Sequence, residues 1–258
     1  EKEINSPGEP GITYHMGSGF PNGSIAAGQQ AFADDLRQRA RHRNDLVLEK
    51  VNPFLDPVKL RYEKDVLPLT PTGNATERHL CQAYEVKAEH MFPDPVKRAR
   101  YWADRLGLED AAILDMDSAK LQGHIRSKTM KSGGVGYQQP TQDTFPLMRD
   151  INTYVAALGG IPTLTWLDGT RAGESADALL DLHQDAGSVA INIVPDRNWN
   201  IKDAADKKVK LERLYEIVEK ADARGLPVQV GTEMNAPGLK FVDDFDAPEL
   251  EPVRASFE

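Results

Sequence analysis

The stretch LGGIPTLTWLDG, residues 158–169, decides the fold of this chain. Its glycine pair ends a helical pattern, and a short apolar run rich in β-branched residues follows, which is typical of a buried strand. Similar runs at 189–194 and 226–230 alternate with helical patterns at 175–186 and 203–224. The order strand, helix, strand, helix, strand predicts an α/β fold with a parallel sheet and right-handed crossovers.

Polar residues follow each of the three predicted strands. Asp168 comes after the first, Asp196 and Arg197 after the second, and Glu233 and Asn235 after the third. Functional groups in parallel α/β folds lie just past the carboxyl ends of the strands. We therefore expect Asp168, Asp196 and Glu233 to meet at one rim of the sheet.

These side chains have two interpretations. Carboxylate and amide oxygens suit hard divalent cations, and a metal held there would polarise an ester or generate hydroxide. Alternatively, Asp168 and Gly169 form a turn and Asp196 caps a loop. Glu233 favours function, because an acid directly after an apolar strand is costly there without a partner.

The first half of the chain has a different character. A loop at 1–10 precedes a short strand at 12–20. Helical patterns then dominate, with Ser24 as a cap for the first helix and Thr76 as a cap for a later one. The predicted helices cover 24–52, a segment opening at Thr76, 96–106 and 109–131, and residues 53–132 form a helical insertion within a single α/β domain of residues 1–258.

Composition narrows the function classes. The net charge of −9 argues against a nucleic-acid partner and does not favour docking on an anionic membrane. No apolar run approaches the roughly 20 residues that span a bilayer, and no signal-peptide pattern opens the sequence. A single cysteine, Cys81, fits a reducing compartment, so we expect a cytoplasmic protein in which Cys81 has a packing role.

The histidines show no metal-ligand spacing. We expect surface or capping roles for His15, His42, His90, His124 and His183. His79 follows Arg78 at the predicted helix start, where both side chains and the helix terminus suit an anion.

Three segments resemble the polymerase-and-histidinol-phosphatase (PHP) family of metal-dependent phosphoesterases. The stretch TERHL at 76–80 is similar to the Thr-Arg-x-His helix start of that family. GGIPTLTWLD at 159–168 resembles its Gly-Gly strand, and LPVQVGTEMN at 226–235 its closing strand. The resemblance spans roughly residues 30–240 and implies a PHP-like distorted (β/α) barrel.

The chain departs from the family pattern at the ligand positions. Trp166 or Asp168 stands where the family has a histidine, and Glu233-x-Asn235 replaces Asp-x-His. The opening His-x-His strand is absent, and residues 12–20 resemble a later strand, so we expect an incomplete barrel. Oxygen in place of nitrogen implies a harder metal or none.

The resemblance implies a divergent metal-dependent hydrolase that acts on a small phosphorylated or carbohydrate-like substrate. Asp168 and Glu233 would be catalytic, and both with Asn235 would hold Mg, Mn, Zn or Fe. The substrate would be bound by four further residues: Arg78, His79, Trp166 and Arg197.

Two alternatives remain open. Loss of every alignable ligand favours a non-catalytic protein that binds a small molecule without metal. An unrelated (β/α) barrel, such as a sugar isomerase or aldolase, is the other, although no lysine follows the three strands to form a Schiff base. No feature of the sequence specifies an oligomeric state.

Overall fold

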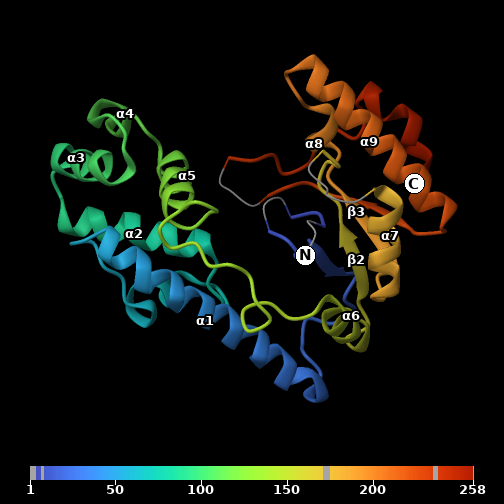
Figure 1. Ribbon diagram of the computed structural model, residues 1–258, viewed down its shortest axis with the longest axis horizontal. Helices are drawn as coiled ribbons and strands as arrows, with labels where there is room; N and C mark the ends of the chain where they lie inside the picture. Colours follow the sequence, from blue (N-terminus) through green and yellow to red (C-terminus); the bar gives the residue numbers. More distant parts are fainter. Residues whose placement is uncertain (1–3, 7–8, 171–174, 235–237, 258) are drawn as a thin grey trace. The chain divides into compact units, whose positions relative to one another are not determined.

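The computed structural model describes residues 4–6, 9–170, 175–234 and 238–257 (Figure 1). The chain divides into two compact units, Glu1–Phe32 with Pro146–Glu258, and Ala33–Phe145. We call the first the α/β unit and the second the helical unit. The predicted helical insertion at 53–132 lies within the helical unit.

The α/β unit contains the predicted alternation of strands and helices. Each strand and helix predicted between 151 and 230 is confirmed within a few residues. Its elements are β1 (His15–Ser18), a 3-10 turn (Ala27–Gln29), α6 (Met148–Ala157), β2 (Ile161–Thr165), α7 (Ala176–Asp185), β3 (Ala190–Ile193), α8 (Asp196–Trp199), α9 (Ala204–Ala223), β4 (Val228–Val230) and a C-terminal 3-10 helix (Pro248–Ser256).

The four strands form one sheet in the order β1-β2-β3-β4. The predicted parallel pairing is confirmed for β2 with β3 and for β3 with β4, where Thr163 faces Ala190 and Ile191 faces Val228. β1 runs antiparallel to β2. Among the described residues the four-stranded sheet is open, and the expected PHP-like barrel is not confirmed.

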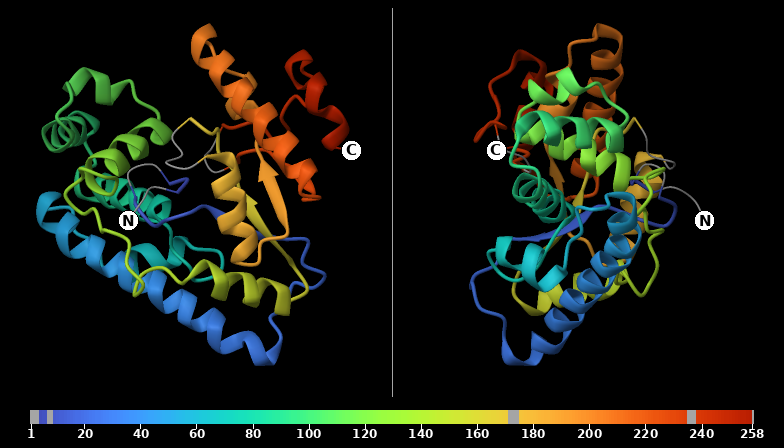
Figure 2. Two further views of the ribbon diagram at one scale, coloured as in Figure 1. Left: turned by 45° about the vertical axis from the view of Figure 1, so that its right-hand side comes forward. Right: turned by 90° about the vertical axis from the view of Figure 1, so that its left-hand side faces the viewer.

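The core of the α/β unit lies between the sheet and two helices. Figures 1 and 2 show α7 and α9 together on one side of β2 and β3. Leu164 and Ile191 from the strands pack with Leu180 of α7 and Ile217 of α9, and all four are at most 1% exposed. Burial of such side chains stabilises a fold by about 1.5–3 kcal/mol each.

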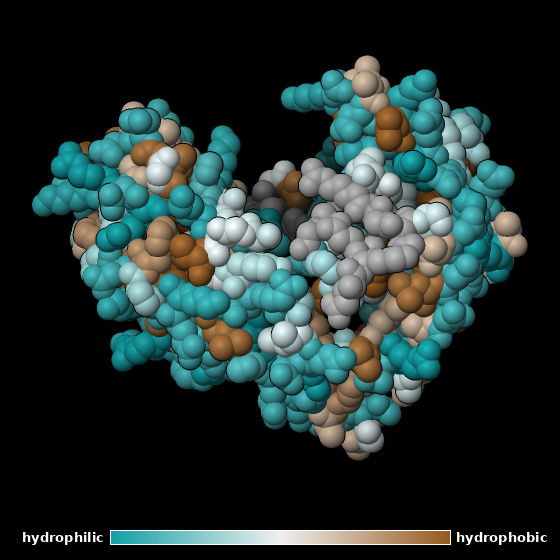
Figure 3. All heavy atoms as spheres, viewed as in Figure 1, coloured by the Kyte–Doolittle hydropathy of each residue, from teal (hydrophilic) through white to brown (hydrophobic). Residues whose placement is uncertain are grey.

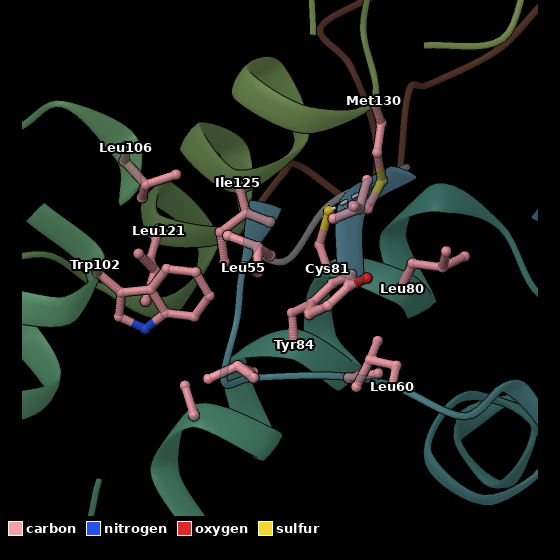
Figure 4. Packing of buried hydrophobic residues seen from close by; sticks show 14 of the residues in the cluster. Leu55, Leu60, Leu80, Cys81, Tyr84, Trp102, Leu106, Leu121, Ile125 and Met130 are labelled. Carbon is pink, nitrogen blue, oxygen red and sulfur yellow. Dashed lines mark hydrogen bonds between the residues drawn. The ribbon is translucent and has the colours of Figure 1, made fainter. Parts of the chain in front are cut away.

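The helical unit has its own core. Figure 4 shows Leu55, which follows α1, together with Tyr84, Trp102 and Ile125 from three different helices. The helices are α1 (Gln30–Phe54), of which the first three residues belong to the α/β unit, α2 (Glu77–Met91), α3 (Pro95–Leu106), α4 (Asp110–Leu114) and α5 (Ser118–Thr129), with a short π turn (Tyr62–Val66) and a 3-10 turn (Leu67–Leu69).

Cys81 has the packing role predicted for it. It is fully buried in the helical core and its Sγ lies 3.8 Å from Sδ of Met130. Burial raises the pKa of the Cys81 thiol to about 12. The thiol is therefore neutral at physiological pH and has little nucleophilic character.

Local capping explains where the helices begin and end. The Asp94 carboxylate accepts the backbone N–H of Val96 at 2.9 Å and starts α3, and Gly107 ends it with a φ of 72°. Asp117 accepts the N–H of Lys120 at 2.8 Å and starts α5. This cap interrupts the single helix predicted over 109–131.

The predicted start of the first long helix was wrong. Ser24 does not cap it, because the chain stays extended at Ala26, and only a 3-10 turn precedes the first α-helical residue, Gln30. Gly28 in this segment lowers its helical propensity. The end was predicted within two residues, since α1 reaches Phe54 with Pro53 in its last turn.

One face of the molecule is largely polar. On the face drawn in Figure 3, hydrophilic residues prevail and hydrophobic residues form small separate groups. None of the described helices has the length and apolar character needed to cross a bilayer.

Gly17 in β1 allows α6 to pack closely on the sheet. A Cβ at this position would lie 2.6 Å from Cζ of Phe20 and 2.8 Å from Cγ2 of Val155 in α6. Real Cβ atoms do not approach other atoms this closely, so a larger residue must displace the helix or the Phe20 ring. A side chain at residue 17 therefore overpacks this contact.

We expect Gly17→Ala to lower the free energy of unfolding by roughly 1–3 kcal/mol. Gly23→Ala is the matched control, because a Cβ there meets no atom within 4 Å. Urea denaturation followed by circular dichroism measures both variants. Equal stability of the two would show that α6 does not need this close approach.

Candidate active site

A pocket of about 480 Å³ lies at the carboxyl ends of β2 and β3 in the α/β unit. We call it the strand-end pocket. It occupies the position where parallel α/β folds carry their functional groups. Its walls are mostly polar and are formed by Asn5, Trp166, Leu167, Asp168, Gly169, Thr170, Leu179, Arg197, Asp206 and Lys210.

Asp168 is held in place by three donors. Its Oδ1 accepts the backbone N–H of Thr170 at 3.1 Å and the Thr170 hydroxyl at 2.8 Å. Its Oδ2 lies 3.3 Å from the Nζ of Lys210, and both side chains are only about one-sixth exposed, at 17% and 16%. Asp168 thus forms the predicted turn and also lines the strand-end pocket.

These contacts keep Asp168 ionised. Burial by itself would raise the pKa of the Asp168 carboxyl, but the hydrogen bonds from Thr170 and the charge of Lys210 outweigh it and lower the pKa below its ordinary value. Asp168 is therefore a carboxylate at neutral pH.

Lys210 reaches the pocket from α9. Its backbone carbonyl accepts a 2.8 Å hydrogen bond from Nδ2 of Asn198, a fully buried side chain of α8. The same amide lies 3.4 Å from the carbonyl of Asp168. Asn198 thus connects the end of β2 to α9 and helps to position the Asp168–Lys210 pair.

The residues after β3 and β4 also pair with opposite charges. Nη1 of Arg197 lies 2.8 Å from Oε2 of Glu233, and both side chains are about one-third exposed. Asp196 forms an ion pair with Lys240 at 3.0 Å. Asp168, Asp196 and Glu233 therefore each have a different cationic partner among the described residues.

Trp166 and Gly169 shape the wall of the pocket. Trp166 is 4% exposed and belongs to the core, so a limited part of its ring is open to a ligand. Gly169 has a φ of 71°, and a Cβ there would lie 2.9 Å from the Trp166 ring and from Cβ of Arg213. Only glycine fits at this position.

A hydrogen-bonded chain holds the N-terminal segment against the strand end. Asn5 donates from Nδ2 to the carbonyl of Thr165 at 3.1 Å and accepts the Thr13 hydroxyl at 2.8 Å. Thr13 Oγ1 lies 2.7 Å from Nε2 of His183, whose Nδ1 lies 3.3 Å from Ser188 Oγ. Because the Thr13 proton points to Asn5, His183 donates from Nε2 and accepts at Nδ1.

The surface or capping role predicted for His183 was wrong. The His183 side chain is 1% exposed and bonds to Thr13, which lies 170 positions away in the sequence. No local sequence pattern reveals a contact between residues so far apart. Burial lowers the pKa of His183 to about 3, with a smaller contribution from His15, and burial also lowers the pKa of His15.

Arg78 and His79 lie in the helical unit, on the first turn of α2. The backbone N–H of Thr76 donates to Nδ1 of His79 at 3.1 Å. His79 therefore completes the N-terminal cap of α2, and among the described residues its Nε2 has no hydrogen-bond partner. Their binding of a substrate stays a prediction.

The sequence did not point to Lys210, Asn5 or Thr170. Strand-end positions predict functional groups only for residues that directly follow a strand, whereas Lys210 approaches from the second turn of α9. Thr170 was detectable, since it completes the turn at Asp168. Asn5 had no local signal, because its partner Thr165 is 160 residues away.

The predicted metal ligands do not fit a divalent cation in the described structure. Lys210 and Arg197 already neutralise Asp168 and Glu233, so a metal would have to displace an ammonium and a guanidinium group. The described residues contain no group of three or more His, Cys, Asp or Glu that could hold a metal ion. Asn235 lies outside the described residues.

No protein-family model and no curated protein sequence matches this chain. Among solved structures it is similar to an amidohydrolase from Chromobacterium violaceum with bound sulfate and no metal. The two share 13% sequence identity with a TM-score of 0.49 over 89% of this chain and 70% of that chain. At this level neither family nor chemistry can be transferred.

The neutral state of His183 makes the α/β unit sensitive to acid. The unfolded chain binds a proton at histidine below about pH 6.5, whereas folded His183 stays neutral until about pH 3. Its contribution to stability is therefore fully present above pH 6.5 and is lost as the pH falls toward 3. Between pH 7 and pH 4.5 we expect a loss of about 2.5 kcal/mol.

Urea denaturation at pH 7 and pH 4.5, followed by Trp166 and Trp199 fluorescence in a Trp102→Phe background, measures this loss. In His183→Gln the difference between the two pH values should shrink by that amount. His124→Gln, at an exposed position, should behave like the parent. An unchanged difference in His183→Gln would assign the acid sensitivity to other groups.

Proposed function

We propose that the protein is a hydrolase that acts in the strand-end pocket. Its substrate is a small phosphorylated or carbohydrate-like molecule that carries an anionic group. One observation carries this proposal. An ionised carboxylate, Asp168, and two cations, Lys210 and Arg197, line one polar pocket at the carboxyl ends of parallel strands. The sequence resemblance to phosphoesterases points to the same class of substrate.

The two cations suit an anionic group. The guanidinium of Arg197 is planar and keeps donors beyond the one directed at Glu233, and such a fork matches the oxygens of phosphate or carboxylate. Its Nε is buried and has no hydrogen-bond partner among the described residues. An oxyanion in the pocket would supply the missing acceptor.

Asp168 is the candidate base. In hydrolysis, a water oxygen forms a bond to the phosphorus or carbon of the substrate while the bond to the leaving oxygen breaks. The water proton passes to Asp168 Oδ2, and the leaving oxygen takes a proton from solvent. Because the pKa of Asp168 is lowered, its main contribution is to orient the water, with Lys210 offsetting the developing negative charge.

A second function is favoured by the charge pairing. Every described acidic side chain directly after the parallel strands has a basic partner, which suits a preformed binding site as well as a catalytic one. Under this alternative, the protein binds a small anionic molecule and does not turn it over.

We expect Lys210→Met to weaken binding of inorganic phosphate and glucose 6-phosphate at least about tenfold, because it removes one of two cations. Asp168→Asn should retain binding and lower the hydrolysis of p-nitrophenyl phosphate by about 100-fold. Calorimetry and nitrophenol release measure the two effects. Lys208→Met, exposed on the same helix, is the control.

Binding without turnover in the parent protein would support the second function. Absence of both binding and turnover with phosphate esters and glycosides would contradict both functions.

Glu233→Gln tests the orientation of Arg197. The neutral amide keeps the size of the side chain and removes the charge that holds the guanidinium, so we expect roughly tenfold weaker phosphate binding. Glu212→Gln, exposed on α9, should bind like the parent. Unchanged binding in Glu233→Gln would remove Glu233 from the site.

A further inference from the structure

The helical unit has a pocket of its own, separate from the function proposed above. It has a volume of about 260 Å³ and is lined by residues of α2, α3, α4 and α5. Figure 1 shows these four helices. We call it the helical pocket. Its apolar wall is formed mainly by Ala99, Ile113, Leu114 and Leu121.

Trp102 also lines this pocket and has an unsatisfied donor. The side chain is fully buried, and its Nε1 has no hydrogen-bond partner among the described residues. Figure 4 shows the indole nitrogen on the ring edge turned away from Leu106. A buried N–H without an acceptor carries the desolvation penalty of the group, so a ligand acceptor here would be stabilising.

The rim of the helical pocket carries charges of both signs. Glu85 and Glu89 come from α2, and Arg98 comes from α3. Arg98 donates from Nη1 to the carbonyl of Phe92 at 3.0 Å, which fixes its position. Neither Arg98 nor Glu89 forms an ion pair with a described residue, so both remain available to a ligand.

We propose that the helical pocket binds a free amino acid with an apolar side chain. The ammonium group would face Glu85 and Glu89, and the carboxylate would accept hydrogen bonds from Arg98 and from Nε1 of Trp102. The side chain would lie against the apolar wall. Such a ligand matches three features together: a cation, Arg98, and an acid, Glu89, without ion-pair partners among the described residues, and the unsatisfied donor of Trp102. Oε2 of Glu85 accepts hydrogen bonds from Ser118 Oγ at 2.8 Å and from Gln122 Nε2 at 2.7 Å, so Glu85 adds negative charge from a fixed position.

The size of the helical pocket limits the ligand. Pockets for drug-sized molecules have volumes of about 300–1,000 Å³, and this one lies just below that range. Leucine, methionine and phenylalanine are therefore suitable probes, whereas a nucleotide is too large.

Calorimetric titration of the full chain with L-leucine, L-methionine and L-phenylalanine tests the proposal. We expect saturable binding, and at least about tenfold weaker binding of both N-acetyl-leucine and leucine methyl ester, since each lacks one charge. Equal binding of leucine and these derivatives would overturn the proposal. So would absence of binding at millimolar concentrations.

Variants assign the binding to this pocket. Arg98→Met and Glu89→Gln should each weaken leucine binding at least about tenfold. Leu114→Trp, at a half-exposed position, should block the pocket without disturbing the core. Arg100→Met is the control, because Arg100 is exposed on the same helix and pairs with Asp110.

Retained leucine binding in all three pocket variants would place the site elsewhere and overturn the proposal. Phosphate binding is measured in the same samples. It depends on the strand-end pocket, so the failure of one proposal leaves the other unaffected.

Discussion

The parallel pairing of β2, β3 and β4 is the constraint on which the α/β unit depends. Parallel strands end at the same edge of a sheet, so residues that are 27 to 37 positions apart in the sequence lie close together there. The crossover helices α7 and α9 bury the apolar side of these strands. The hydrophobic core and the backbone hydrogen bonds between the strands fix the edge at which the strands end. The strand-end pocket lies at this edge, and its polar residues are placed there by the strands that they follow.

Charge compensation follows from that geometry. Side chains at the edge are partly withdrawn from water, and an isolated carboxylate there would be destabilised. The chain supplies Lys210 for Asp168, Arg197 for Glu233 and Lys240 for Asp196. A rim that looks acidic in the sequence thus becomes a set of ion pairs, and the further donors of Arg197 and Lys210 support the anionic ligand that we propose.

The helical unit shows how the same principles produce a different kind of site. Tyr84 and Ile125 are fully buried in its core, yet Trp102 has an unsatisfied donor and lines a small pocket. Well-packed interiors contain few such groups, so an exception next to charged side chains is informative. The two pockets differ in chemistry and lie in units with separate cores, and each can be tested without the other.

The sequence by itself determined the strands, the helices and the parallel sheet between residues 151 and 230, because hydrophobic periodicity and glycine stops are local properties. It also placed Asp168, Arg197 and Glu233 at strand ends. Only the tertiary structure decided their partners. Lys210 reaches Asp168 from a neighbouring helix, and Asn5 and Thr13 connect the N-terminal segment to Thr165 and to buried His183. Such contacts depend on how distant segments pack, and packing leaves no periodic signal in the residues it joins.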